Sequence, residues 1–361
     1  MKALIDLNAL GRNLARIREL SGGASLVAMV KANAYGHGLV PVTRFLESKG
    51  VSIFGVARLE EGEVLRQAGI SSQILLMAGA GAFLNAKRLL NANVTPVVSS
   101  FEELEALEGL GLVWPVHIDI DTGMSRAGFS MAEIPALIQW FKLKRFAQID
   151  GLITHFANAE SAQCEFTAKQ LAEFEHAVKQ FESAGLKAKV LHVAKSTAIV
   201  NSVTPSLTGY ECWVRPGIAL YGGCEGFEPV MSWQAPVTLV KNLEPGMTVG
   251  YNQTWKAQRE TKVALLRAGY GDGYPRSLSS QGSVLIGGKR APVIGRVSMD
   301  VITVDVTDVD CQVGDRAVLL GQDGLGKITA QELAETCGTI SYEIFTRLAE
   351  RVEREYVGTS S

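Results

Sequence analysis

The sequence lacks long uninterrupted apolar runs, paired cysteine motifs and an excess of charge of either sign. Its 361 residues carry a formal net charge of −2, with 20% charged and 47% apolar residues. This balance is ordinary for a globular protein and shows no excess of positive charge of the kind that binds nucleic acid or anionic lipid. We therefore expect small-molecule partners and no nucleic acid.

The missing apolar runs and cysteine pairs also bear on location. The first twenty residues, MKALIDLNALGRNLARIREL, break their apolar positions with arginine and aspartate, unlike a secretory signal. No later stretch is long enough to cross a bilayer. The five cysteines are odd in number and scattered, which argues against a disulfide framework or a zinc knuckle. We expect a cytoplasmic protein with no membrane partner and no metal site.

Up to about residue 222 the chain alternates short aliphatic runs with longer helical patterns. Eight such runs begin near residues 25, 51, 73, 94, 116, 147, 189 and 213. Their weak alternation of apolar and polar residues is typical of strands buried on both faces of a parallel sheet. Eight strand–helix units in this length predict a (β/α)8 TIM-type barrel. Periodicity alone leaves a doubly wound open sheet as the alternative.

Helix signals fill the segments between these runs. Capping boxes join Ser100 to Glu103 and Ser130 to Glu133, each ahead of an apolar face. Residues 165–185 repeat apolar side chains at helical spacing and end at a glycine. We expect helices to start at both capping boxes.

The pattern changes after about residue 235. The runs become short and alternating, separated by glycine, proline and aspartate turns, with one clear helix predicted from the Thr329 to Glu332 capping box. This is typical of a mostly antiparallel β domain. The predicted division is therefore a barrel over 1–232 and a β domain over 233–361, with the boundary near 230–236.

Chemically unusual residues follow several of the predicted barrel strands. In a TIM barrel the reactive groups lie at the C-terminal ends of the strands. The residues at these ends are Lys31, Asp119, Arg126, His155, Ser196 and Arg215.

Lys31 stands in the stretch MVKANAYGHG, residues 29–38. A lysine buried at a barrel rim loses hydration of its charged form, so its pKa falls and its neutral amine becomes available for Schiff-base formation. Ser196 and the Gly217 and Ile218 amides of RPGIALYG would form a phosphate cradle. Taken singly, a solvated lysine and a plain Pro-Gly turn are the alternatives. Together, amine, cradle and flanking cations indicate a pyridoxal phosphate site, where His155 could stack on the cofactor.

A series of motifs along the chain resembles the alanine racemases, fold-type III enzymes that use pyridoxal phosphate. In order, the motifs are MVKANAYGHG, DTGMSRAGF, THFANAE, VRPGIALYG, AGYGDGYPR, GRVSMD and GTISYEIFTRL. The resemblance covers nearly the whole chain. It implies a homodimer with shared active sites that interconverts L-alanine and D-alanine.

The resemblance also implies the role of each matching residue. Lys31 would carry the cofactor and act as the base on one face of the substrate, and Tyr270, given by the other subunit, would be the base on the opposite face. Two bases suit racemisation because one proton leaves Cα on one face and another arrives on the other. The remaining implied roles are phosphate binding by Tyr35, Ser196, Gly217, Ile218 and Tyr342; contact of Arg126 with the cofactor's phenolic oxygen and the substrate carboxylate; contact of Arg215 with the pyridine nitrogen; an amide from Met299 for the carboxylate; and an entrance lined by Arg296 and Ile340. We add the hypothesis that His155 helps to lower the pKa of Tyr270.

Two positions depart from the family pattern. Asp119 stands where many members carry a lysine, sometimes carbamylated, and its carboxylate could hold Arg126 directly. Lys195 replaces the usual asparagine before the phosphate-binding serine, and it could either strengthen phosphate binding or point outward.

Other functions remain open from the sequence. A racemase of serine, lysine or another amino acid would differ in only a few pocket residues. A fold-type III decarboxylase would need a different lysine context and a cysteine near the substrate. A non-catalytic pyridoxal phosphate carrier would need only the barrel.

Overall fold

The computed structural model describes the chain except for residues 78–85, 112, 145–146, 160–163, 204–207 and 359–361. The end of the third predicted strand run, 78–79, and the last residue of the THFANAE motif lie outside the described residues. Two compact units form: Gly11–Ala34 with Leu39–Leu220, and Met1–Leu10 with Tyr35–Gly38 and Tyr221–Ser361.

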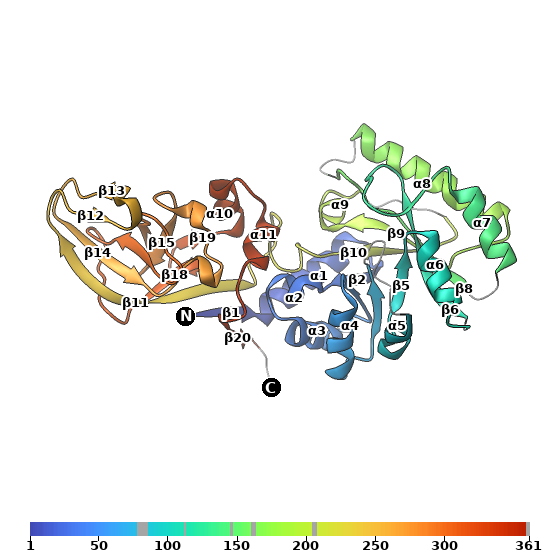
Figure 1. Cartoon of the computed structure of the whole chain (residues 1–361), viewed down its shortest axis with the longest axis horizontal. Helices are drawn as coiled ribbons and strands as arrows, with labels where there is room; N and C mark the ends of the chain where they lie inside the picture. Colours follow the sequence, from blue (N-terminus) through green and yellow to red (C-terminus); the bar gives the residue numbers. More distant parts are fainter. Residues whose placement is uncertain (78–85, 112, 145–146, 160–163, 204–207, 359–361) are drawn as a thin grey trace. The chain divides into compact units, whose positions relative to one another are not determined.

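The first unit holds a closed parallel barrel, coloured from blue to yellow-green in Figure 1. Each strand pairs with the next, and the circle closes because β10 pairs with β2 and β5 with β6. The closure confirms the barrel and rules out the open doubly wound sheet. The barrel strands are β2 (Ser25–Met29), β3 (Ile53–Val56), β4 (Gln73–Leu76), β5 (Thr95–Val98), β6 (Trp114–Asp121), β8 (Ala147–Ile153), β9 (Val190–Lys195) and β10 (Glu211–Arg215); the short β7 (Phe129–Ser130) adds to β6.

The apolar character of the barrel strands follows from burial on both faces. All four residues of β3 and of β5 are buried, as expected when helices cover the outside of a filled barrel. The helices between strands are α1 (Leu7–Leu20), α2 (Lys31–Tyr35), α3 (Leu39–Ser48), α4 (Leu59–Gln67), α5 (Ala86–Ala92), α6 (Phe101–Glu108), α7 (Ile134–Leu143), α8 (Glu165–Ser183) and α9 (Ser196–Val200).

One of the two predicted helix starts in the barrel is correct. The Ser100 side chain accepts a hydrogen bond from the Glu103 amide and caps α6. Ser130 instead lies in β7, and its amide and hydroxyl both donate to the Glu133 carboxylate. Glu133, and not Ser130, is the N-cap residue of α7, which begins at Ile134. The prediction at Ser130 was wrong because the same serine–glutamate spacing also closes a turn.

The second unit holds a sheet in the order β16-β15-β18-β11-β1-β20, with β14, β17 and β19 paired beside it. All its pairs are antiparallel except β1 with β20, which confirms the mostly antiparallel prediction. Its strands are β1 (Lys2–Asp6), β11 (Met231–Leu243), β14 (Thr261–Leu266), β15 (Ser283–Ile286), β16 (Lys289–Pro292), β17 (Ile302–Asp305), β18 (Arg316–Asp323), β19 (Gly326–Ile328) and β20 (Glu353–Val357); a separate hairpin pairs β12 (Thr248–Val249) with β13 (Trp255–Lys256).

Helix α10 (Ala330–Cys337) begins where the Thr329 capping box predicts. Sequence reasoning missed a second helix, α11 (Ser341–Thr346), because six residues are too few to show a helical period. Three short 3₁₀ segments complete the unit: η1 (Tyr251–Gln253), η2 (Tyr270–Asp272) and η3 (Arg276–Leu278).

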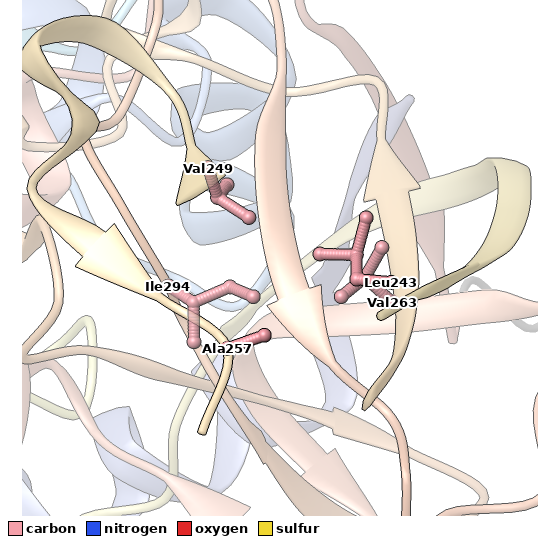
Figure 2. Packing of buried hydrophobic residues seen from close by; sticks show 5 residues of the cluster. All are labelled: Leu243, Val249, Ala257, Val263 and Ile294. Atoms are coloured by element: carbon pink, nitrogen blue, oxygen red, sulfur yellow. The ribbon is translucent and has the colours of Figure 1, made fainter. Parts of the chain in front are cut away.

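A small apolar cluster ties the hairpin of this unit to its main strands. Figure 2 shows its side chains meeting from separate strands and loops, and Trp255 packs against them. Each of the five cluster residues is at most 9% exposed, so their burial stabilises the packing of the hairpin against β11 and β14. The cluster consists of Leu243, Val249, Ala257, Val263 and Ile294. Among the described helices, none is long and apolar enough to span a membrane.

Candidate active site

The chemically unusual residues of the barrel lie at the ends of its strands. Lys31 comes two residues after β2, and Ser196 begins α9 directly after β9. Arg215 is the last residue of β10, and His155 follows β8 by two residues. Because parallel strands of a closed barrel run the same way, these ends share one rim.

The backbone after Lys31 turns in the left-handed sense. Ala32, Asn33, Ala34 and Tyr35 have φ values of 52° to 55°, although none of them is a glycine. Each such residue costs about 1 kcal/mol or more, and strain of this kind gathers at functional sites. The turn therefore needs side chains that hold it in place.

Glu61 of α4 supplies one such support, which sequence reasoning missed. One carboxylate oxygen accepts a 2.6 Å hydrogen bond from the Ala32 amide, next to Lys31. The other accepts from the amides of Ala57 and Arg58, at 2.8 and 3.1 Å, in the loop after β3. The available signal was its place in the first turn of a helix, where glutamate commonly binds free amides.

The Lys31 amine has the electrostatic setting expected of a nucleophile. Burial lowers its pKa below the usual lysine range, and the nearby Arg126 cation lowers the pKa further. The Glu61 carboxylate opposes both by raising it. The neutral amine is therefore more abundant at working pH than for an exposed lysine.

Arg215 is buried, with 4% of its surface exposed, and is fixed by main-chain acceptors. Its guanidinium donates to the carbonyls of His192, Thr154 and Val193, the last two at 2.8 and 3.2 Å. Burial lowers its pKa to about 10, with Asp119 acting in the opposite direction. It therefore stays a cation near neutral pH, held by three main-chain carbonyls.

His155 lies among the cations of the barrel. Burial lowers the pKa of its ring, and the charges of Arg215, Arg126, Lys195 and Lys31 add to this effect and bring the pKa to about 2. Its Nδ1 lies 3.2 Å from Arg215 Nη2. A guanidinium only donates, so Nδ1 accepts and the ring proton sits on Nε2. His155 is therefore a neutral hydrogen-bond donor rather than a cation.

The structure brings the predicted cradle residues together. The Ser196 hydroxyl, buried at 3% exposure, accepts from the Gly217 amide at 2.8 Å and from the Ala219 amide at 3.3 Å. Ile218 lies between these amides and is also buried. Sequence reasoning named all of these except Ala219.

Asp119 and Arg126 line one small cavity of the barrel with His155. Burial raises the pKa of Asp119 to about 6, while Arg215 and Arg126 act to lower it. Lys195 reaches toward the Ala157 carbonyl, 3.5 Å from its Nζ, and its charge acts on His155.

Tyr35 and Tyr342 lie together in the second compact unit. Their ring centroids are 5.9 Å apart, and Tyr35 also stacks on Tyr221 at 4.9 Å. Burial raises the pKa of Tyr35, with Tyr342 adding to the effect, and raises that of Tyr342 to about 12. Both phenols therefore keep their protons and can donate to an anion.

Tyr270 and Met299 are neighbours in the same unit. The Tyr270 amide donates to the Ser298 carbonyl at 3.0 Å, and the Gly271 amide donates to the Met299 carbonyl at 2.9 Å. Both side chains are exposed, at 41% and 53%. They are thus presented outward as a pair.

The two residues predicted at the entrance also lie in this unit. Ile340, at 62% exposure, precedes α11, and Arg296 is partly buried between β16 and β17. Within the described part of the chain, no group of three or more histidine, cysteine, aspartate or glutamate side chains has a metal-binding arrangement.

Comparison with known proteins matches both parts of the chain to family models. Residues 5–225 match the model described as alanine racemase, N-terminal domain, and residues 230–356 match alanine racemase, C-terminal domain. An alanine racemase of Halothermothrix orenii is 36% identical, covering 98% of this chain and 96% of the relative. One of Methylacidiphilum infernorum is 39% identical, covering 98% and 91%.

Solved structures agree with these matches. Alanine racemase from D-cycloserine-producing Streptomyces lavendulae superposes with a TM-score of 0.90 at 32% identity, covering 99% of this chain and 97% of that one. Alanine racemase from Bacillus anthracis with bound L-Ala-P superposes with a TM-score of 0.89 at 30% identity, covering 99% and 95%.

Proposed function

The chain belongs to the alanine racemase family, and from that premise we propose how its residues interconvert L-alanine and D-alanine. It is an enzyme, an amino-acid racemase. The observation that carries the proposal is that a lysine with a depressed pKa and a buried serine hydroxyl, which accepts from two amides, follow strands that end on the same barrel rim. The division into a barrel over 1–232 and a β domain over 233–361 stays a prediction.

Members of this family use pyridoxal phosphate, and the donors of this chain fit that cofactor. Lys31 offers a neutral amine for an aldehyde. The Ser196 hydroxyl and the Gly217 and Ile218 amides would be the phosphate donors, and the Gly217 amide donates to the Ser196 hydroxyl in this structure. Pyridoxal phosphate, when bound, would supply a conjugated ring that accepts the electron pair left on Cα after proton removal. Tyr35 and Tyr342, both protonated phenols, would add donors to the phosphate.

Arg215 would face the ring nitrogen of the cofactor in this proposal. A guanidinium does not give up its proton at working pH, so Arg215 donates a hydrogen bond without protonating the nitrogen. The electron sink is thereby weakened, which limits side reactions such as transamination. His155, neutral and carrying its proton on Nε2, supports the Arg215 guanidinium from one side through Nδ1.

Two bases would act on the substrate from opposite faces. Lys31 moves a proton at one face of Cα, and Tyr270 of the partner subunit moves one at the other. Met299 of the partner subunit offers its amide, and Arg126 its guanidinium, to the substrate carboxylate. If each site needs both subunits, the active form is a head-to-tail homodimer with two sites.

The experiment that tests this function is chiral chromatography of a panel of L-amino acids incubated with the cofactor-loaded protein. We expect D-alanine to form fastest. Faster formation of another D-amino acid, such as D-serine or D-lysine, would keep the two-base chemistry and overturn the alanine assignment. Absence of any D-amino acid from a protein that holds the cofactor would overturn the racemase proposal.

We propose that the Asp119 carboxylate orients Arg126 without any carbamylated lysine. Because burial raises the pKa of Asp119 to about 6, the carboxylate is ionised above that pH and neutral below it. Protonation of Asp119 would remove its charge-assisted interaction with Arg126, worth roughly 1–2 kcal/mol. We therefore expect the KM for L-alanine to rise several-fold between pH 8 and pH 5.

The variant Asp119→Asn should have the high KM at every pH and lose this transition. Racemisation by the wild-type protein in carbonate-free buffer should not change when bicarbonate is added. Stimulation by bicarbonate, or a pH profile of KM that is the same in the variant, would contradict the role given to Asp119.

A further inference from the structure

The two loops that carry Tyr270 and Met299 are bonded into one backbone unit. Besides the two amide-to-carbonyl hydrogen bonds between them, the glycines of the GYGDG motif allow their close approach. A Cβ at Gly269 would lie 2.2 Å from the Met299 carbonyl oxygen, and one at Gly271 would lie 2.6 Å from Arg351 Nη2. At Gly269 the obstacle is backbone, so only glycine leaves room for the two loops to approach each other this closely.

Asp272 anchors the first loop from inside. The side chain is buried, with 4% exposure, and its Oδ2 accepts the Gly269 amide at 2.8 Å. Its own carbonyl accepts the Ala349 amide at 3.0 Å. The remaining carboxylate oxygen, Oδ1, lies 2.6 Å from Nε of Arg351. A buried carboxylate with this set of partners holds the start of the Tyr270 loop against the segment before β20.

Arg351 connects this anchor to the second loop. Its Nη2 donates to Asp300 Oδ1 at 2.8 Å and lies 3.5 Å from the Met299 carbonyl oxygen. The guanidinium therefore binds one carboxylate from each loop. These are Asp272, two residues after Tyr270, and Asp300, the residue after Met299. A planar fork of donors can do this at fixed angles, whereas a lysine ammonium is a single point charge.

We propose that Arg351 is a positioning residue that fixes the Tyr270 hydroxyl relative to the Met299 amide, through Asp272 and Asp300. The inference rests on the roles proposed for Tyr270 and Met299. Proton transfer at Cα demands that the base and the carboxylate anchor keep one separation, and a misplacement of about 1 Å costs on the order of a hundredfold in rate. In this proposal Arg351 acts only through these two carboxylates.

The test compares Arg351→Met with Arg347→Met in the cofactor-loaded enzyme. Arg347 is a matched control because it lies four residues earlier, is similarly exposed, and pairs with Glu343 within its own segment. We expect Arg351→Met to lower kcat/KM roughly 10- to 100-fold, with both kcat and KM affected. Arg347→Met should remain within about twofold of the wild type. Arg351→Lys should recover only part of the loss.

Alanine with deuterium at Cα gives a readout that a merely structural role would not move. If Arg351 positions Tyr270, the isotope effect on kcat/KM should rise in Arg351→Met for one enantiomer only, the one whose proton Tyr270 removes. The second variant, Asp300→Asn, leaves the Asp272 contact intact and should raise KM more than it lowers kcat. It keeps the test available if Arg351→Met does not fold.

The outcomes separate this inference from the proposed function. Kinetics of Arg351→Met and Asp300→Asn that match those of Arg347→Met would overturn the positioning role. A lowered melting temperature with unchanged kcat, KM and isotope effects would overturn it too, because stability alone would then explain the contacts. If Tyr270→Phe racemises normally, the role given to Tyr270 itself fails, whatever Arg351 does.

Discussion

Replacing Lys31 with alanine is expected to abolish racemisation and covalent attachment of the cofactor together. The amine is the group whose pKa burial and Arg126 depress, and the stretch MVKANAYGHG that contains the left-handed turn has no other lysine. Loss of a nucleophile that also serves as a base should cost roughly a thousandfold or more. Chiral chromatography of L-alanine turnover measures the first effect.

The second effect is measured by borohydride reduction followed by mass spectrometry. The wild-type protein should gain the mass of the reduced cofactor on the peptide that contains Lys31, and Lys31→Ala should gain none. Lys144→Ala is the control, because Lys144 is an exposed barrel lysine paired with Glu108. Cofactor mass found on another lysine of the wild type would contradict the assignment of Lys31.

Replacing Tyr270 with phenylalanine is expected to cost on the order of 10² to 10⁴ in racemisation rate while the cofactor stays attached. The change removes one hydroxyl from a side chain that is 41% exposed, so folding of the domain should not suffer. Comparison of kcat for both directions, with melting temperature as the control for folding, measures the effect. Near-normal rates in both directions would show that another group is the second base.

Mixing the two inactive variants tests whether Tyr270 acts across subunits. A dimer of one Lys31→Ala subunit and one Tyr270→Phe subunit contains one intact site only if Lys31 and Tyr270 come from different subunits. Random pairing on co-expression should then restore about one quarter of the wild-type rate. If the mixture stays inactive although mixed dimers form, both bases belong to the same chain.

The candidate site was predicted from chain position and from residue type. Lys31 and Ser196 follow barrel strands and Arg215 ends one, and parallel strands place the residues at their ends on one rim. The spacing of Ser130 and Glu133, by contrast, led to a wrong helix start. A short local pattern satisfies the same hydrogen bonds in a turn as at a helix start, and only the path of the surrounding chain distinguishes the two.

Supports of the site could not be predicted in this way. Glu61 holds the turn after Lys31 from a helix 29 residues further along the chain. Arg351 binds Asp300 across 51 residues. Contacts of this separation depend on how the strands pair, and a charged residue on an exposed helix has the same sequence pattern whether or not it reaches such a partner.

The sequence by itself determined the eight strand–helix units, the antiparallel second sheet and the residues offered for chemistry, because periodicity and strand-end position are local properties of the chain. The tertiary structure alone decided the closure of the barrel, which ring nitrogen of His155 carries the proton, and the contacts of Arg351 with Asp272 and Asp300. Each of these depends on groups brought together from distant segments. Their burial and mutual charge, which set pKa values and orientation, exist only once the chain has folded.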